Sequence, residues 1–150
     1  MYKNAKKTKH HLLLFMLIMS YFNSSAQIEN ITEKYNLPAT VSETSGLLFF
    51  NGKLITHNDS GDNANLYELD TITGNITRTI NIVNATNIDW EDITQDETYI
   101  YIGDFGNNSA GNRQDLKIYR VLKSDYLSNT SITSEIITFS YEDQTDFTSQ

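Results

Sequence analysis

The clearest fold signal in the chain is residues 47–56, which read LLFFNGKLIT. The first four residues are apolar and aromatic, and Leu54-Ile55-Thr56 resumes the apolar pattern after the turn. Between them, Asn51-Gly52 is the dipeptide most typical of a two-residue hairpin turn, because both turn positions need a positive φ. The stretch therefore predicts a β-hairpin.

Further short strands are expected after this hairpin. The next are residues 66–69 and 76–83, the latter with alternating apolar and polar residues. A second series follows at a short strand around Ile93 and at residues 99–102, 116–122 and 132–141, with polar loops at 57–65 and 103–115. Because no window shows a 3.6-residue period, the sequence predicts an all-β protein without helices.

The two series resemble each other. The loop Asp-Ser-Gly-Asp-Asn at 59–63 matches Asp-Phe-Gly-Asn-Asn at 104–108 with an offset of 45, and each precedes a strand with a central tyrosine. A four-stranded unit that recurs near 45 residues is typical of β-propeller blades. The expected divisions are a lead-in at 27–42, blades at 43–86 and 87–141, and the start of a third to residue 150.

Two blades leave sheet faces uncovered, so we expect the chain to be the N-terminal fragment of a larger propeller. The alternative is a single β-sandwich of about eight strands. The matched loops favour the propeller.

Residues 1–26 have the pattern of a secretory signal peptide. Lys3, Lys6, Lys7 and Lys9 precede an apolar run of about 11 residues, and the small residues Ser24-Ser25-Ala26 follow. The alternative, a membrane anchor, needs about 20 apolar residues. The sequence predicts export, with cleavage after Ala26 and no membrane span afterwards, to the outside, the outer surface or the periplasm of a Gram-negative bacterium.

Charge narrows the classes of partner. The first 26 residues contain four of the 11 basic residues and none of the 19 acidic ones. Residues 27–150 therefore have seven basic and 19 acidic residues, a net charge of −12. Such a chain lacks the clustered cations that nucleic-acid phosphates need, and it suits divalent cations. The chain has no cysteine, which excludes disulfides and cysteine chemistry.

The matched loops are the first candidate site. Their oxygen-bearing side chains suit calcium, and the glycine permits a tight turn. Neither loop completes a known calcium-loop pattern, and the same residue types also build ordinary turns. The candidates are Asp59, Asp62, Asn63, Asp104, Asn107 and Asn108.

The second candidate is the acidic group around Trp90, the single tryptophan: Asp89, Glu91 and Asp92. Each blade is expected to start near an acid, Glu43 or Glu91, and first strands line a propeller's channel. Converging carboxylates bind a cation or raise one another's pKa. The proposed calcium ligands are Glu43, Glu91, Asp59 and Asp104. The alternative is a tryptophan packed between blades, with solvated acids beside it.

Two single residues complete the candidates. His57 is a potential ligand or general base, although a lone loop histidine is more often polar surface. Arg113 could meet an anionic substrate, although an arginine in an acidic loop more often pairs locally. The sequence has no nucleophile elbow, zinc-protease motif, phosphate loop or dinucleotide fingerprint.

Four segments carry a family resemblance: residues 56–62, 87–93, 101–108 and 118–121. They resemble exported bacterial β-propeller proteins that are similar to six-bladed propellers, and many of these carry a sorting domain for type IX secretion. The similarity covers residues 42–141, and its specific parts are Asp-Trp-Glu-Asp and Gly-Asp-Phe-Gly-Asn-Asn. About four blades would be absent here. The resemblance implies calcium-dependent lactonases, phosphoesterases or pure binding modules as relatives.

Two functions therefore remain open. The first is an exported binding or scaffold propeller for an extracellular small molecule, glycan or protein. The second is a calcium-dependent hydrolase of phosphoesters or lactones. The absence of a nucleophile and of a complete metal motif favours the first.

Overall fold

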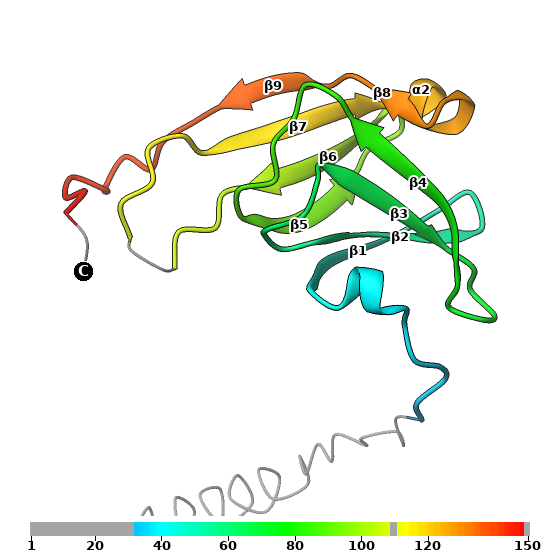
Figure 1. Cartoon of the computed structure of the whole chain (residues 1–150). Coiled ribbons are helices and arrows are strands. Elements are labelled where there is room, and N and C mark those ends of the chain that lie inside the picture. Colours follow the sequence, from blue (N-terminus) through cyan, green and yellow to red (C-terminus); the bar gives the residue numbers. More distant parts are fainter. Residues whose placement is uncertain (1–31, 109–110, 149–150) are drawn as a thin grey trace, which may run out of the picture. The chain divides into compact units, whose positions relative to one another are not determined.

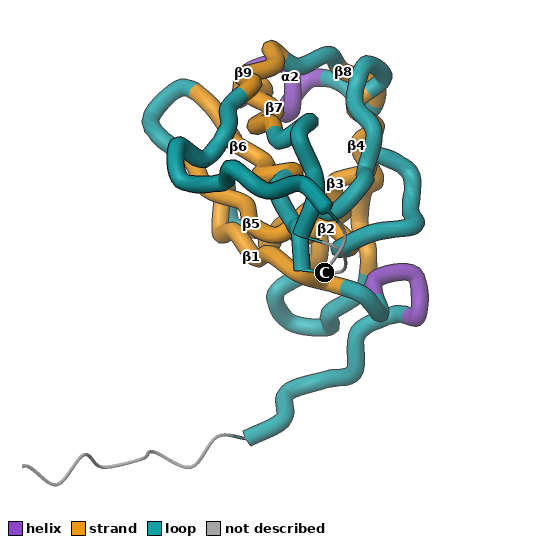
Figure 2. The backbone as a smooth tube through the Cα atoms, turned by 90° about the vertical axis from the view of Figure 1, so that its left-hand side faces the viewer, coloured by secondary structure: helices purple, strands orange, loops and turns teal. Residues whose placement is uncertain are grey.

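A computed structural model describes residues 32–108 and 111–148, and residues 34–150 form one compact unit (Figure 1). The expected signal peptide at 1–26 and the first part of the expected lead-in lie outside the described residues. Strands make up most of the regular secondary structure among the described residues, which also contain two short helical segments: a 3₁₀ turn, η1 (Ala39–Val41), and α2 (Lys123–Ser128) (Figure 2).

The first sheet is an antiparallel meander. Its strands are β1 (Thr44–Phe50), β2 (Lys53–Asn58), β3 (Asn65–Leu69) and β4 (Ile76–Ile82), each paired with the next. Asn51 and Gly52 form the β1–β2 turn with φ of 50° and 75°, as the predicted hairpin requires. A two-residue strand, β8 (Ser131–Ile132), adds in parallel to β4.

The second sheet repeats this meander. It contains β5 (Trp90–Gln95), β6 (Tyr99–Asp104), β7 (Lys117–Leu122) and β9 (Glu135–Thr138), in that order and antiparallel throughout. The fold is therefore mostly β, with sheets of five and four strands. Within the described residues, these sheets do not close into a ring.

The first hairpins of the two sheets share one register. Thr44 pairs with Asn58, and Trp90 pairs with Asp104; each pairing is followed by a β-bulge in the first strand. Equivalent residues are therefore 46 positions apart, so the predicted offset of 45 is wrong by one in this region. The sequence match followed the Asp-x-Gly letters, whereas hydrogen-bond pairing makes Asp104 the counterpart of Asn58.

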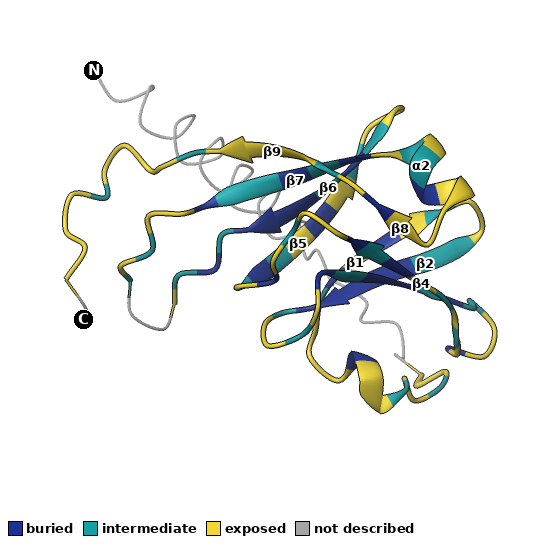
Figure 3. Cartoon of the chain, turned by 45° about the horizontal axis from the view of Figure 1, so that its top comes forward, coloured by how far each residue is buried: buried dark blue, intermediate teal, exposed yellow. Residues whose placement is uncertain are grey.

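The core lies between the two sheets, where the buried residues gather (Figure 3). The first strands, β1 and β5, lie beside each other. Equivalent strands of the two sheets turn opposite faces toward this core. Ile93 on β5 is 5% exposed, whereas its counterpart on β1, Leu47, is 61% exposed. The two sheets thus pack front to back.

Three local predictions are wrong. The expected strand 132–141 is divided into β8 and β9, which join different sheets. The loops predicted from His57 and from Gly103 begin later, because His57-Asn58 and Gly103-Asp104 extend β2 and β6. The helix α2 was not expected. It buries Tyr126 alone, so it has no apolar stripe from which a 3.6-residue period could be recognised.

Among the described residues, no helix is long and apolar enough to span a membrane.

Candidate cation site between the two sheets

Three carboxylates meet where the two sheets adjoin. One carboxylate oxygen each from Asp59, Asp89 and Glu91 lies within 4.8 Å of the other two, and all three residues are partly buried. Asp59 follows β2 of the first sheet, whereas Asp89 immediately precedes β5 of the second sheet and Glu91 is the second residue of that strand. The cluster therefore joins residues from both sheets.

The backbone explains why these side chains converge. Trp90 is fully buried in the core, whereas its two chain neighbours, Asp89 and Glu91, are only partly buried and bring their carboxylates together beside Asp59. The Trp90 N–H donates to the Asp59 carbonyl over 2.6 Å, which joins the end of β2 to the start of β5. The bulge at Glu91 gives this residue freedom from the regular pairing.

Gly106 forms a wall of the cluster. Its N–H donates to the Asp89 carbonyl over 3.0 Å. A Cβ at this position would lie 2.2 Å from the Asp89 carboxyl carbon and 2.4 Å from Glu91 Oε1. Only glycine lets the backbone approach the carboxylates this closely.

The electrostatics of the cluster favour a bound cation or a shared proton. Burial raises the pKa of Asp89, and the carboxyl of Asp59 raises it further, while the Arg113 guanidinium opposes both. The Oδ1 atom of Asp59 is buried and has no hydrogen-bond partner among the described residues. A buried carboxylate oxygen without a donor is unfavourable unless a cation or a proton meets it.

The residues fit calcium. Two oxygens that bind one calcium ion at 2.3–2.6 Å lie at most about 5 Å apart, which the cluster satisfies. Three side chains would leave several of the six to eight calcium ligand positions to backbone oxygens, water or a ligand.

Two of the predicted calcium ligands, Asp104 and Glu43, lie outside the cluster. Asp104 is fully buried and accepts the Asp89 N–H over 3.2 Å, so it supports the backbone without joining the three carboxylates. Glu43 is exposed outside the cluster. Its counterpart in the shared register is Asp89, and the counterpart of Glu91 is Ser45.

His57 lies inside the protein, on β2, and not on the polar surface. It is fully buried, and its ring meets the Trp90 ring edge-on at 5.5 Å. Burial lowers its pKa, and Nδ1 lies 3.2 Å from the Asn58 carbonyl. These contacts make His57 part of the packing between the sheets.

The remaining predicted residues are placed in loops or at a strand surface. Asp62 accepts hydrogen bonds from the Asn58 amide at 2.7 Å and the Tyr67 hydroxyl at 2.6 Å, so it braces its own loop. Asn107 Oδ1 accepts the Arg113 N–H over 2.8 Å. Asn63 and Asn108 are exposed, and Asp92 is exposed on β5. The loops are therefore held by local hydrogen bonds of the kind ordinary turns use.

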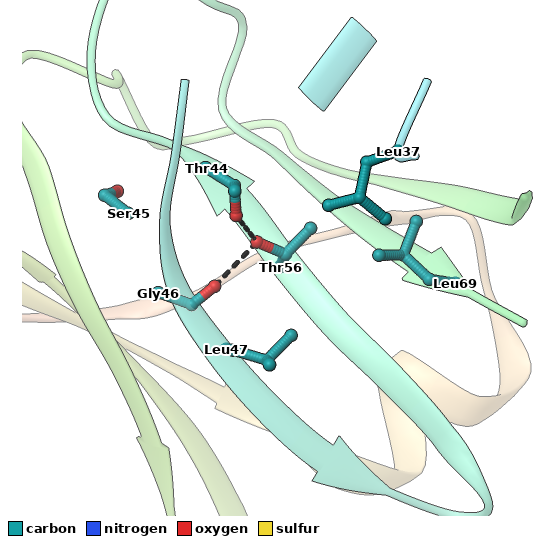
Figure 4. Close-up of a pocket in the computed structure, with 7 residues that line it drawn as sticks. All are labelled: Leu37, Thr44, Ser45, Gly46, Leu47, Thr56 and Leu69. Carbon is teal, nitrogen blue, oxygen red and sulfur yellow. Dashed lines mark hydrogen bonds between the residues drawn. The ribbon is translucent and has the colours of Figure 1, made fainter. Parts of the chain in front are cut away.

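A separate hollow lies on the other face of the first sheet. It holds about 250 Å³ and is lined by Leu37, Thr44, Ser45, Gly46, Leu47, Thr56 and Leu69 (Figure 4). The Thr56 hydroxyl bonds to Thr44 and donates to the Gly46 carbonyl over 2.6 Å. Since the lining has no charged side chain, we place the candidate site at the carboxylates.

No protein-family model, curated protein or solved structure matches this chain. The site is therefore interpreted from its own geometry.

Proposed function

We propose that this chain is part of an exported β-propeller binding protein that holds a calcium ion at the junction of its first two blades. The observation that carries this proposal is the convergence of Asp59, Asp89 and Glu91 within 4.8 Å. Hard cations prefer carboxylate oxygens, and the acidic composition of the chain agrees with such a partner.

The packing of the sheets supports a propeller. A symmetric sandwich of two similar sheets buries equivalent faces, whereas here one sheet buries Ile93 and the other exposes its counterpart Leu47. Front-to-back packing leaves one open face at each end, and repetition of such contacts produces rings when the rotation closes. The side-by-side first strands, β1 and β5, agree with strands that line a central channel.

Export is supported by the sequence alone, through the lysines, apolar run and Ser24-Ser25-Ala26 pattern of residues 1–26. Calcium is abundant outside the cell, where weak sites are sufficient for binding. A calcium ion at this junction would link the loop after β2 to the start of β5. Its open positions would accept oxygens of an extracellular ligand, such as glycan hydroxyls or a carboxylate.

Thermal unfolding of the full chain, with calcium and with chelator, tests the proposal. A ligand that binds only the folded state stabilises it by about 2.7 kcal/mol at a hundredfold excess over Kd. We expect calcium to raise Tm in the wild type and in Glu43→Gln, the matched exposed acid, but not in Glu91→Gln. An equal Tm with calcium and chelator in the wild type would contradict the proposal.

A second candidate, hydrolysis of a lactone or phosphoester, is favoured by one observation. The raised pKa of Asp89 beside Asp59 is the arrangement of a carboxyl that donates or accepts a proton. This function predicts turnover of ester and lactone substrates that Asp89→Asn abolishes. Calcium binding with no turnover would leave the binding function alone.

A further inference from the structure

Arg113 lies in the loop between β6 and β7, and its side chain is only 14% exposed. It ion-pairs with Asp104 at 2.9 Å and with Asp115 at 3.0 Å. Its Nη1 donates to the Gly106 carbonyl over 2.9 Å. One guanidinium therefore links a buried strand end, a loop carbonyl and a surface acid.

These contacts close a ring around the carboxylate cluster. Asp104 Oδ1 accepts both the Asp89 N–H and the Arg113 Nη2–H. Arg113 also donates to the Gly106 carbonyl, and the Gly106 N–H donates to the Asp89 carbonyl, which completes the ring. The ring fixes the backbone at Asp89, which carries one cluster carboxylate, and at Gly106, which forms the wall.

We propose that Arg113 is the positioning residue of the cation site: through Asp104 and Gly106 it holds Asp89 and Glu91 at the spacing that a calcium ion requires. This inference rests on the proposed function. It assigns to Arg113 an indirect role, because its guanidinium donates to the residues that surround the site and not to the ion.

The equivalent position in the first sheet shows what the arginine adds. There Asn58 takes the place of Asp104, and its amide donates to the loop residue Asp62 over 2.7 Å. An amide supplies its own donors, whereas the buried Asp104 carboxylate needs a cation beside it. In the second sheet, Arg113 meets this need and also reaches Gly106.

The fork geometry of arginine is essential to this role. A guanidinium presents several donors in one plane, so it can bond to Asp104 and Gly106 together, whereas a lysine ammonium is a compact point charge. Arg113→Lys therefore keeps the charge and breaks the ring. Arg78→Lys is the matched control, since Arg78 is a half-buried arginine that pairs with Glu68 at 3.1 Å in the first sheet.

Calorimetric titration of the full-chain variants with calcium, together with Tm in chelator, tests the inference. We expect Arg113→Lys to weaken calcium binding at least tenfold, and Arg78→Lys to keep the wild-type Kd even where its Tm in chelator falls. A purely structural role would lower Tm in chelator and leave Kd unchanged. If Arg113→Lys does not fold, Asp104→Asn, which copies Asn58, is expected to weaken binding in the same direction.

The outcomes separate the two proposals. Wild-type calcium affinity in a folded Arg113→Lys or Asp104→Asn protein would overturn the role of Arg113 and leave the site itself standing. Absence of calcium binding in the wild type would overturn the proposed function, and the positioning role with it.

Discussion

The β1–β2 and β5–β6 hairpins have the same register and a β-bulge at the same position, but they carry different side chains at equivalent positions. Where the first has the exposed Thr44, the second has the fully buried Trp90; where the first has Ser45, the second has Glu91. The strand pairing is thus repeated in the two sheets, whereas the carboxylate cluster is not. The carboxylates therefore belong to the junction between the sheets and not to each repeat.

The largest expected effect comes from the first of these pairs. Trp90 packs against His57 and Tyr119, with ring centroids 5.5 Å and 5.7 Å away, and donates to the Thr86 carbonyl. Trp90→Ala should cost about 3–5 kcal/mol of unfolding free energy through the cavity it leaves. Thr44→Ala should cost about 1 kcal/mol or less. Urea unfolding measures both, and equal losses would show that the two positions are not as different as their burial indicates.

The next effect concerns the glycine wall. Because a Cβ on Gly106 would collide with two carboxylates, Gly106→Ala should spread the cluster, cost about 1–3 kcal/mol and abolish calcium stabilisation. The counterpart in the shared register is the exposed Ser60, and Ser60→Ala should change stability by less than about 0.5 kcal/mol. Thermal unfolding in calcium and in chelator would contradict this account if the Gly106→Ala protein kept the wild-type calcium response.

The smallest effect is a pH dependence in the absence of calcium. The raised pKa of Asp89 means that the folded state binds its proton more tightly than the unfolded state. The wild type should therefore lose stability as pH rises from the ordinary aspartate range through the folded-state pKa. Asp89→Asn removes this loss, so in chelator it should be more stable than the wild type at neutral pH, by less than about 1 kcal/mol, with the difference vanishing in acid.

The free energy of unfolding, measured in chelator from acidic to neutral pH for the wild type and for Asp89→Asn, tests the direction of this pH dependence. Comparison with the variant isolates Asp89 from other carboxyls such as the partly exposed Asp70, whose pKa is lowered to about 2 and which shifts stability in the opposite direction. In calcium the order should reverse, because the variant lacks a ligand. A variant less stable than the wild type in chelator at neutral pH would contradict the proposed repulsion within the cluster.

The strands were predictable because their signals are local. The turn at Asn51-Gly52 and the apolar alternation of residues 76–82 depend on neighbouring residues alone, and the structure has both. The division of residues 131–138 between two sheets was not predictable, since it depends on β4 offering a free edge to β8. Alternation along a chain does not say which sheet a strand will join.

The residues of the candidate site could be predicted only in part, because residue types are visible in the sequence and strand register is not. Asp59, Asp89 and Glu91 were each singled out by residue type, but Glu43 was paired with Glu91 because each lies near the start of an expected blade, and not from the strand register. A bulge shifts side chains without changing composition, so the sequence could not show that Ser45 occupies the position of Glu91. The contacts of Arg113 could not be predicted from the sequence, because they depend on how the loop after β6 folds back onto Asp104 at the end of that strand.

The most direct test of the cation site uses Trp90, the single tryptophan, which lies between two of the proposed ligands. Terbium substitutes for calcium and emits when a nearby indole transfers energy to it. We predict terbium emission on excitation of Trp90. Calcium should displace the terbium and abolish this emission, which should be retained in Glu43→Gln and lost in Glu91→Gln. Absence of sensitised emission from the wild type, or emission that Glu91→Gln leaves unchanged, would contradict the central claim that these carboxylates hold a cation.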